Sequence, residues 1–256
     1  MSDYDRNVAA RGFGAAGQAA VIDAGLRAYM IRVYNYMAAG VALTGVASWA
    51  AFQAAGGDAI HIVGNQITGL TPFGQAVFGG ALFWVLAIGT IGMVWFLSAR
   101  IDRLQASTAF GLFMLYSGLL GVLLATVFMQ YTGTSIARTF FISAASFGAL
   151  SLYGYTTQRD LSPMGTFLRM GVIGLILAML LQWWLKSPGL DFAISAIGVL
   201  IFAGLTAYDT QSIKEMYSAN DDGTATGRKA VMGALRLYLD FINLFLFMLR
   251  FMGDRR

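Results

Sequence analysis

The chain has 256 residues and a formal net charge of +4, and it is 57% hydrophobic but only 12% charged. Soluble domains carry about 25% charged residues, so this composition excludes an ordinary soluble fold and indicates an integral membrane protein. The absence of cysteine and the single histidine, His61, exclude disulfides, thiolate metal sites and a histidine-based metal site within one chain. The positive charge is typical of basic loops beside a membrane, and no nucleic-acid partner is expected.

Seven apolar runs, each long enough for the roughly 20 residues that a membrane-spanning helix needs, predict an all-α integral membrane fold. Before them, residues 1–27 are mixed in polarity and rich in small residues, so we expect a flexible cytoplasmic N-terminal arm. Residues 28–256 then form a seven-helix transmembrane domain, which leaves no room for a soluble catalytic domain. The expected helices span residues 33–53, 76–97, 106–129, 136–156, 168–185, 192–213 and 231–252.

The positions of Lys and Arg predict the orientation of the bundle, because cytoplasmic loops carry more of these residues. With the N-terminal arm in the cytoplasm, nearly all loop Lys and Arg fall on that side, and the opposite loops hold only Arg138 and Lys186. The C-terminal Arg250, Arg255 and Arg256 disagree with this pattern, since seven crossings put them outside. Either the tail is an exception or the seventh segment does not cross fully, and the sequence leaves the side of the C-terminus open.

Two carboxylates, Asp209 and Asp240, lie inside the last two apolar runs. A charge at membrane depth is expensive and marks a candidate functional site. Asp209 lies about two turns before the polar loop that joins these runs and Asp240 about three turns after it, so at ~1.5 Å per residue the two reach similar depth. We therefore expect them to meet, to titrate as a pair and to suit a hard cation such as Ca²⁺. A purely structural pair, satisfied by neighbouring groups, is the alternative.

Several polar residues are close enough in sequence to support this pair. Tyr208, Gln211 and Asn243 neighbour the aspartates along the chain. Arg236 precedes Asp240 by four residues, so it either lies on the same helix face and pairs with it or points to the interface.

Other candidate residues carry weaker predictions. Arg100 ends the second apolar run and either reaches inward to the aspartates or extends to lipid headgroups. Arg169 is interpreted only as a signal of topology, and the spacing Ala144-x-x-x-Gly148 suits close helix packing. No nucleotide-binding or zinc-protease motif occurs, and a serine hydrolase would need His61, which lies in an outer loop. The chain is therefore not expected to be an enzyme.

Both aspartates lie in recognisable motifs, which read Ala207-Tyr208-Asp209-Thr210-Gln211 and Leu237-Tyr238-Leu239-Asp240-Phe241. Together with Leu249-Arg250-Phe251, these motifs resemble those of the Bax inhibitor-1 (TMBIM) family, and the resemblance covers nearly the whole chain after Arg27. It implies a fold in which six helices wrap around a central C-terminal helix. The chain departs from the family in its long N-terminal arm and its extended first outer loop.

The resemblance also implies a function, a Ca²⁺ leak across the membrane that responds to pH. Asp209 and Asp240 would be the proton sensor and the ion pathway, with Ca²⁺ touching both as it passes. A basic residue that ends the second helix would latch the closed pore through this pair; Arg100 matches that position and Arg103 is the fallback. Ca²⁺ is then the transported ion, and no cofactor is expected.

A different class of function follows from the same resemblance. Bacterial relatives are linked to regulation of a membrane AAA protease, so direct binding to such a membrane partner is the alternative. The lack of targeting features and the bias of Lys and Arg suit a multi-pass protein of a bacterial inner membrane. The expected partners are therefore the lipid bilayer, Ca²⁺ and a membrane protease, and the oligomeric state is not predicted.

Overall fold

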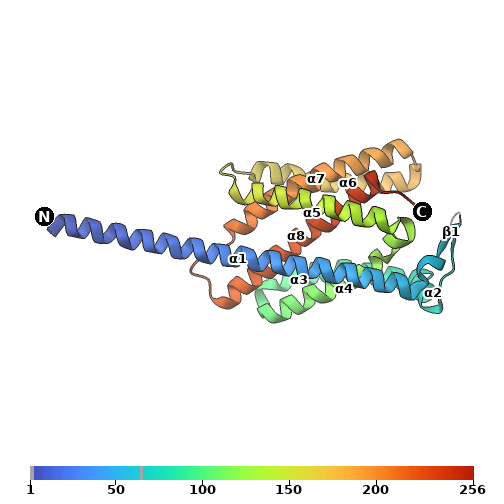
Figure 1. The fold of residues 1–256 in the computed structure, drawn as a ribbon, viewed down its shortest axis with the longest axis horizontal. Coiled ribbons are helices and arrows are strands. Elements are labelled where there is room, and N and C mark those ends of the chain that lie inside the picture. Colours follow the sequence, from blue (N-terminus) through green and yellow to red (C-terminus); the bar gives the residue numbers. More distant parts are fainter. Residues whose placement is uncertain (1–2, 64–65) are drawn as a thin grey trace.

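The structure is a computed structural model that describes residues 3–63 and 66–256, with side chains described for residues 23–61 and 67–256. The described residues form eight α-helices and one short hairpin (Figure 1). Seven of the helices are long and apolar enough to cross a membrane, so the predicted all-α membrane fold is confirmed. The helices are α1 (Asp3–Ala55), α2 (Pro72–Phe78), α3 (Ala81–Arg100), α4 (Ala106–Gln130), α5 (Gly133–Thr156), α6 (Ser162–Leu185), α7 (Pro188–Glu215) and α8 (Gly223–Met252).

Several helices begin well before the expected apolar runs. The α8 helix begins at Gly223 instead of residue 231, because the side chain of Asp222 caps it by accepting a hydrogen bond from the backbone N–H of Ala225. The α1 helix begins at Asp3 and runs through most of the segment expected to be an arm; residues 1–2 of that arm lie outside the described residues. Figure 1 shows this first half of α1 extending away from the bundle.

The predicted start of the second helix, expected at residues 76–97, is wrong, because α3 begins only at Ala81. Two glycines divide it: α2 ends before Gly79, and Gly80 adopts an extended backbone (φ −145°, ψ −163°) before α3 begins. Glycine is a poor helix former because its backbone has more freedom to lose, so it ends a helix readily. The loop before α2 contains a hairpin that the sequence did not predict, in which β1 (His61–Val63) pairs antiparallel with β2 (Gln66–Thr68).

The C-terminal helix α8 is the centre of the bundle. In its most apolar 18-residue window 72% of the residues are buried, against 11% for α3 and 17% for α6. It packs against α1, α4, α5 and α7, while α3 packs mainly on α4 and α6 on α7. The predicted central C-terminal helix is therefore confirmed, with α3 and α6 on the outside.

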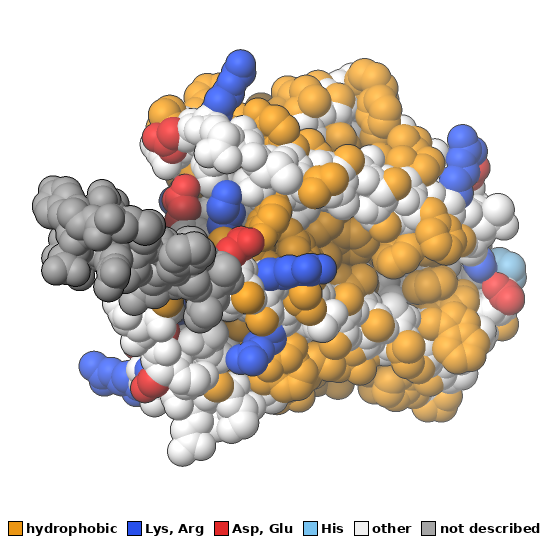
Figure 2. Space-filling model, turned by 60° about the vertical axis from the view of Figure 1, so that its left-hand side comes forward, with side chains coloured by type: hydrophobic (Ala, Val, Ile, Leu, Met, Phe, Trp, Pro, Cys, Tyr) orange, Lys and Arg blue, Asp and Glu red, His pale blue; other side chains and the backbone are white. Residues whose placement is uncertain are grey.

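The outer surface of the bundle is apolar over its middle. The peripheral helices expose Trp84 and Trp95 on α3 and Trp183 and Trp184 on α6. Figure 2 shows hydrophobic side chains over the middle of one face, with most charged side chains towards the two ends. This distribution is what a lipid-facing surface requires, because the hydrocarbon core cannot solvate charge.

The C-terminal tail folds against the end of the bundle that lies opposite the N-terminus (Figure 1). Backbone hydrogen bonds tie it to the turn between α4 and α5, from Thr132 N to Asp254 O (3.2 Å) and from Arg256 N to Gln130 O (2.9 Å). The α8 helix has 30 residues and is long enough to cross. The C-terminus therefore emerges on the side opposite the start of the first span.

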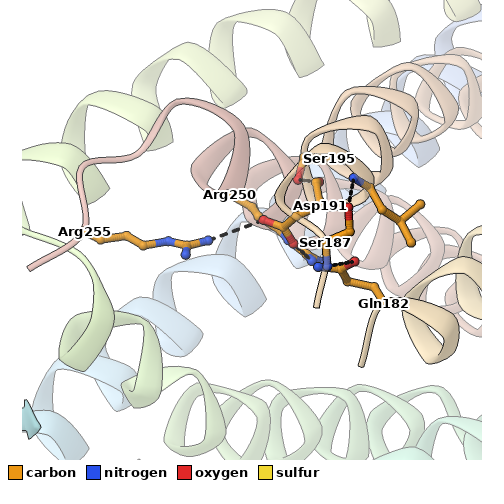
Figure 3. Close-up of polar contacts among 7 residues, drawn as sticks. Gln182, Ser187, Asp191, Ser195, Arg250 and Arg255 are labelled. Atoms are coloured by element: carbon orange, nitrogen blue, oxygen red, sulfur yellow. Dashed lines mark hydrogen bonds and ion pairs between the residues drawn. The ribbon is translucent and has the colours of Figure 1, made fainter. Parts of the chain in front are cut away.

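The three arginines near the C-terminus all have acidic partners at this end. Arg250 and Arg255 both pair with Asp191 in the first turn of α7, and Figure 3 shows the two side chains converging on it. Arg256 pairs with Asp58 of the first loop at 3.1 Å. These neutralised pairs account for basic residues on a side where the other loops hold few.

Replacing Asp191 by Asn is expected to destabilise the fold by about 1–3 kcal/mol, because charged hydrogen-bonding partners would be lost from a partly buried site. The side chains of Asp191 and Arg250 are only 26% and 27% exposed. Thermal unfolding of the purified protein in detergent measures the effect. Asp58→Asn is the matched control: its side chain is 84% exposed, so the loss is expected to be under about 1 kcal/mol. Equal effects of the two substitutions would contradict the assignment.

Candidate functional site

The structure brings Asp209 of α7 and Asp240 of α8 side by side inside the bundle. The two residues are 9% and 5% exposed. One oxygen of each carboxyl group, Oδ1 of Asp209 and Oδ2 of Asp240, has no hydrogen-bond partner among the described residues. Buried polar atoms normally have partners, so these two acceptors leave the pair able to take up a proton or to contact a cation.

Close helix packing fixes the position of Asp209. A Cβ atom on Gly154 of α5 would overlap the backbone carbonyl oxygen of Ala207, so only glycine allows α5 to approach α7 here. On the other side, a Cβ on Gly165 of α6 would lie 2.5 Å from the ring carbons of Tyr208. Contacts from α5 and α6 at the two residues before Asp209 therefore hold its backbone and leave its side chain directed to α8.

Two arginines from different helices face the pair. Nη2 of Arg169, on α6, lies 3.9 Å from Oδ1 of Asp209, and the same nitrogen donates to the hydroxyl of Tyr208 at 3.2 Å. Its guanidinium also lies 5.0 Å from the centre of the Tyr208 ring, and the Arg169 side chain is 58% exposed. Arg236 of α8 lies close enough to act on both carboxylates. The site thus combines two acids with two arginines.

Arg169 is the residue that the sequence analysis missed. It lies seven residues into α6, which is about 10 Å along the helix axis at 1.5 Å per residue. Asp209 lies six residues before the end of α7, or about 9 Å, and α7 is the next helix in the chain. Arg169 and Asp209 therefore lie at similar depth along neighbouring helices. The same comparison of depths that predicts the contact between the two aspartates would have identified Arg169.

The expected latch residue Arg100 lies elsewhere in this structure. It is exposed at the C-terminal end of α3 and forms no ion pair with another described residue. Arg103, the fallback, is also exposed, in a short 3₁₀ turn (Ile101–Arg103) that contacts α8 through a hydrogen bond from Arg228 to the carbonyl of Asp102. Neither residue is among the charges that face the aspartates, and their latch role stays a prediction.

Two of the supporting residues have local roles instead. The side chain of Gln211 accepts from Leu161 N (2.9 Å) and donates to Arg159 O (2.8 Å), which holds the loop between α5 and α6. Residues two apart on a helix do not face the same way, which is why Gln211 does not reach the site of Asp209. Asn243 donates to the carbonyl of Leu239 in its own helix (2.8 Å).

The carboxylates do not form a closed metal site. Throughout the described part of the chain, no three side chains of His, Cys, Asp or Glu gather as they would around a bound metal ion. Ca²⁺ takes about 6–8 oxygen ligands, so the two carboxylates alone supply too few for a resident Ca²⁺ site. The chemistry available at the pair is the exchange of a proton and contact with a cation.

Comparison with known proteins gives a consistent family match. Residues 26–256 match the family model described as "Inhibitor of apoptosis-promoting Bax1". The "Inner membrane protein YbhL" of Escherichia coli (strain K12) is 45% identical over 236 residues, which cover 91% of this chain and 94% of that protein. An uncharacterised protein of Rickettsia prowazekii is 44% identical over 234 residues, 91% of this chain and 92% of its own. A protein of Caulobacter vibrioides, also uncharacterised, is 40% identical over the full length of both chains.

Proposed function

Because the chain belongs to the Bax inhibitor-1 family, we propose that it forms a pH-sensitive leak for Ca²⁺ that is gated by Asp209 and Asp240. The observation that carries this proposal is the pair itself, two buried carboxylates side by side in adjacent membrane helices, each with one oxygen lacking a partner. Ionisable groups at membrane depth are expensive and mark ion and proton routes. The name of the Escherichia coli relative and the distribution of Lys and Arg support a place in a bacterial inner membrane with the N-terminus in the cytoplasm.

In this mechanism, protons change the charge balance where α6, α7 and α8 meet. Two adjacent carboxylates seldom ionise together, so a proton shared by the pair holds α7 and α8 together. When the proton leaves, the two ionised carboxylates repel each other and attract the guanidinium groups of Arg169 and Arg236. The helix expected to move is α3, because it is the least buried of the seven spans and rests mainly on α4. Ca²⁺ then moves down its gradient past the two carboxylates.

Ca²⁺ flux into dye-loaded liposomes that carry the purified protein tests the proposal. Between about pH 6 and 8, where a coupled buried pair can titrate, the unsubstituted protein should leak more than empty liposomes and should do so in a pH-dependent way. The double substitution Asp209→Asn with Asp240→Asn should leave flux that no longer responds to pH. Ca²⁺ flux no greater than in empty liposomes, or identical pH profiles for the two proteins, would refute the proposed Ca²⁺ leak.

A second candidate function, restraint of a membrane AAA protease by direct binding, is favoured by the long α1 helix. Its N-terminal half extends away from the bundle and offers a surface outside the membrane domain (Figure 1). On this reading, deletion of residues 1–22 should abolish capture of the protease from solubilised membranes and leave Ca²⁺ flux unchanged. Capture by the truncated protein at the level of the full chain would remove the arm as the binding site.

A further inference from the structure

A large apolar groove lies between α1 and α5. Its volume is about 950 Å³, and it is open along the outer surface. Pockets for small molecules have volumes of about 300–1,000 Å³, so this groove is at the upper end of that range. The buried side chain of Phe241, on the central helix α8, contributes to its lining.

Small residues on both helices create the groove. Ala38, Ala42 and Gly45 recur along one face of α1, and Ala144 and Gly148 line the opposite wall on α5. A Cβ atom added to Gly45 or to Gly148 would meet no other atom within 4 Å. The Ala144-x-x-x-Gly148 spacing, expected to bring two helices together, therefore lines a hollow. An unfilled hollow forfeits dispersion contacts, so in a bilayer an apolar occupant is favoured.

The shape of the groove favours a narrow chain over a helix. The hydroxyl of Tyr34 on α1 lies 2.6 Å from Oγ of Ser151 on α5, so side chains of the two walls meet within the lining. A transmembrane helix with its side chains is about 10–12 Å wide and does not fit between walls that touch. A lipid acyl chain is thin and flexible enough to pass such a constriction.

The groove is long enough to hold the acyl chain of a lipid in one leaflet. Beyond Arg27 at its mouth, the apolar lining extends along α1 from Met30 to Gly45, which is about 22 Å at 1.5 Å per residue. One leaflet supplies about half of a hydrocarbon core that is roughly 30 Å thick. An acyl chain that enters at the Ile31 end can therefore lie along most of the lining.

Positive charge gathers at the same end. Arg27 lines the groove there, is exposed and pairs with no acid among the described residues. Beside it lies Tyr155, whose carbonyl oxygen accepts from Nζ of Lys214 at 2.9 Å and whose ring lies 5.5 Å from the same nitrogen. Arg27 at the mouth of the apolar groove, with Lys214 bound to the backbone of the lining residue Tyr155, fits a lipid phosphate above its acyl chain.

We propose that the α1/α5 groove is a binding site for one anionic phospholipid. An acyl chain lies against Ala42 and Gly148, and the phosphate pairs with Arg27 at the membrane surface. The lining does not include the two aspartates, and the proposal does not depend on Ca²⁺ conduction.

Photo-crosslinking locates the lipid. The full chain is placed in nanodiscs with phosphatidylglycerol that carries a diazirine in its acyl chain, and the labelled peptides are identified by mass spectrometry. Labels should concentrate at least fivefold in residues 30–45 of α1 and 144–152 of α5 over the exposed helices α3 and α6. Unlabelled phosphatidylglycerol should compete about tenfold better than phosphatidylcholine. Uniform labelling of all lipid-facing helices, or equal competition by the two lipids, would overturn the proposal. Both outcomes are measured on the unsubstituted protein.

Matched substitutions test each half of the site. Gly148→Leu fills the hollow and should reduce groove labelling about tenfold, whereas Gly92→Leu on α3, where a Cβ also meets nothing within 4 Å, should not. Arg27→Gln should reduce the preference for phosphatidylglycerol several-fold, whereas Arg32→Gln, an exposed cation of the same helix outside the groove, should not. Labelling unchanged by Gly148→Leu would refute the site. Cross-links between α1 and α5 of two copies would identify a second chain as the occupant instead.

Discussion

Asparagine in place of Asp240 is expected to abolish the pH dependence of Ca²⁺ flux, whereas asparagine in place of Asp209 should leave a weaker, single-site dependence. The difference follows from the neighbours of each carboxylate. Without Asp240, Asp209 keeps Arg169 at 3.9 Å and Arg236 nearby, and these two positive charges favour its ionised form. Without Asp209, Asp240 stays buried in the bundle core and still exchanges a proton.

The measurement is flux against pH for the two single variants in the liposomes described above. For Asp240→Asn, flux at about pH 6 and at about pH 8 should agree within roughly a factor of two, because the two arginines favour the ionised form of the one carboxylate that remains. Asp58→Asn is the control, because this carboxylate is 84% exposed in the first loop and its loss is expected to disturb the fold little. A pH profile of Asp240→Asn that matches the unsubstituted protein would exclude Asp240 as the sensor.

The seven spans could be predicted from the sequence because lipid imposes one requirement on all of them, a long apolar run with its backbone paired internally. Their ends could not, because a helix does not stop where the membrane does. The polar turn that starts α8 is helical from Gly223, held by the Asp222 cap and not by hydropathy. In the opposite sense, the apolar residues around Gly79 and Gly80 conceal a break between α2 and α3.

The meeting of the two aspartates could also be predicted, since depth along two antiparallel helices with a short link is simple geometry. Which other side chains face the pair depends on helix rotation and on packing between elements, and sequence spacing does not give these. Gln211 is only two residues from Asp209, yet it bonds to the loop between α5 and α6. Arg169 is forty residues away and lies beside Asp209, because close contacts at Gly165 and Tyr208 bring α6 against α7.

This placement gives Arg169 and Arg100 different expected effects on gating. Arg169 favours the ionised form of the aspartate pair, so Arg169→Gln should make ionisation harder and move the midpoint of flux against pH upward. We expect a shift of about half to one pH unit, reduced by added salt because the Arg169 side chain is largely exposed. Arg169→Lys, which keeps the charge, should restore most of the original midpoint.

Arg100→Gln separates the two possible latches in the same flux measurement. In this structure Arg100 ends the outlying helix α3 and does not face the carboxylates, so its loss should leave the midpoint unchanged. A latch at Arg100 that forms only in another closed state would instead reveal itself as a higher leak at every pH. If Arg100→Gln moves the midpoint and Arg169→Gln does not, the charge that controls the pair comes from α3. If only Arg169→Gln moves it, the sensor is built from α6, α7 and α8, and α3 responds to it without contributing a charge.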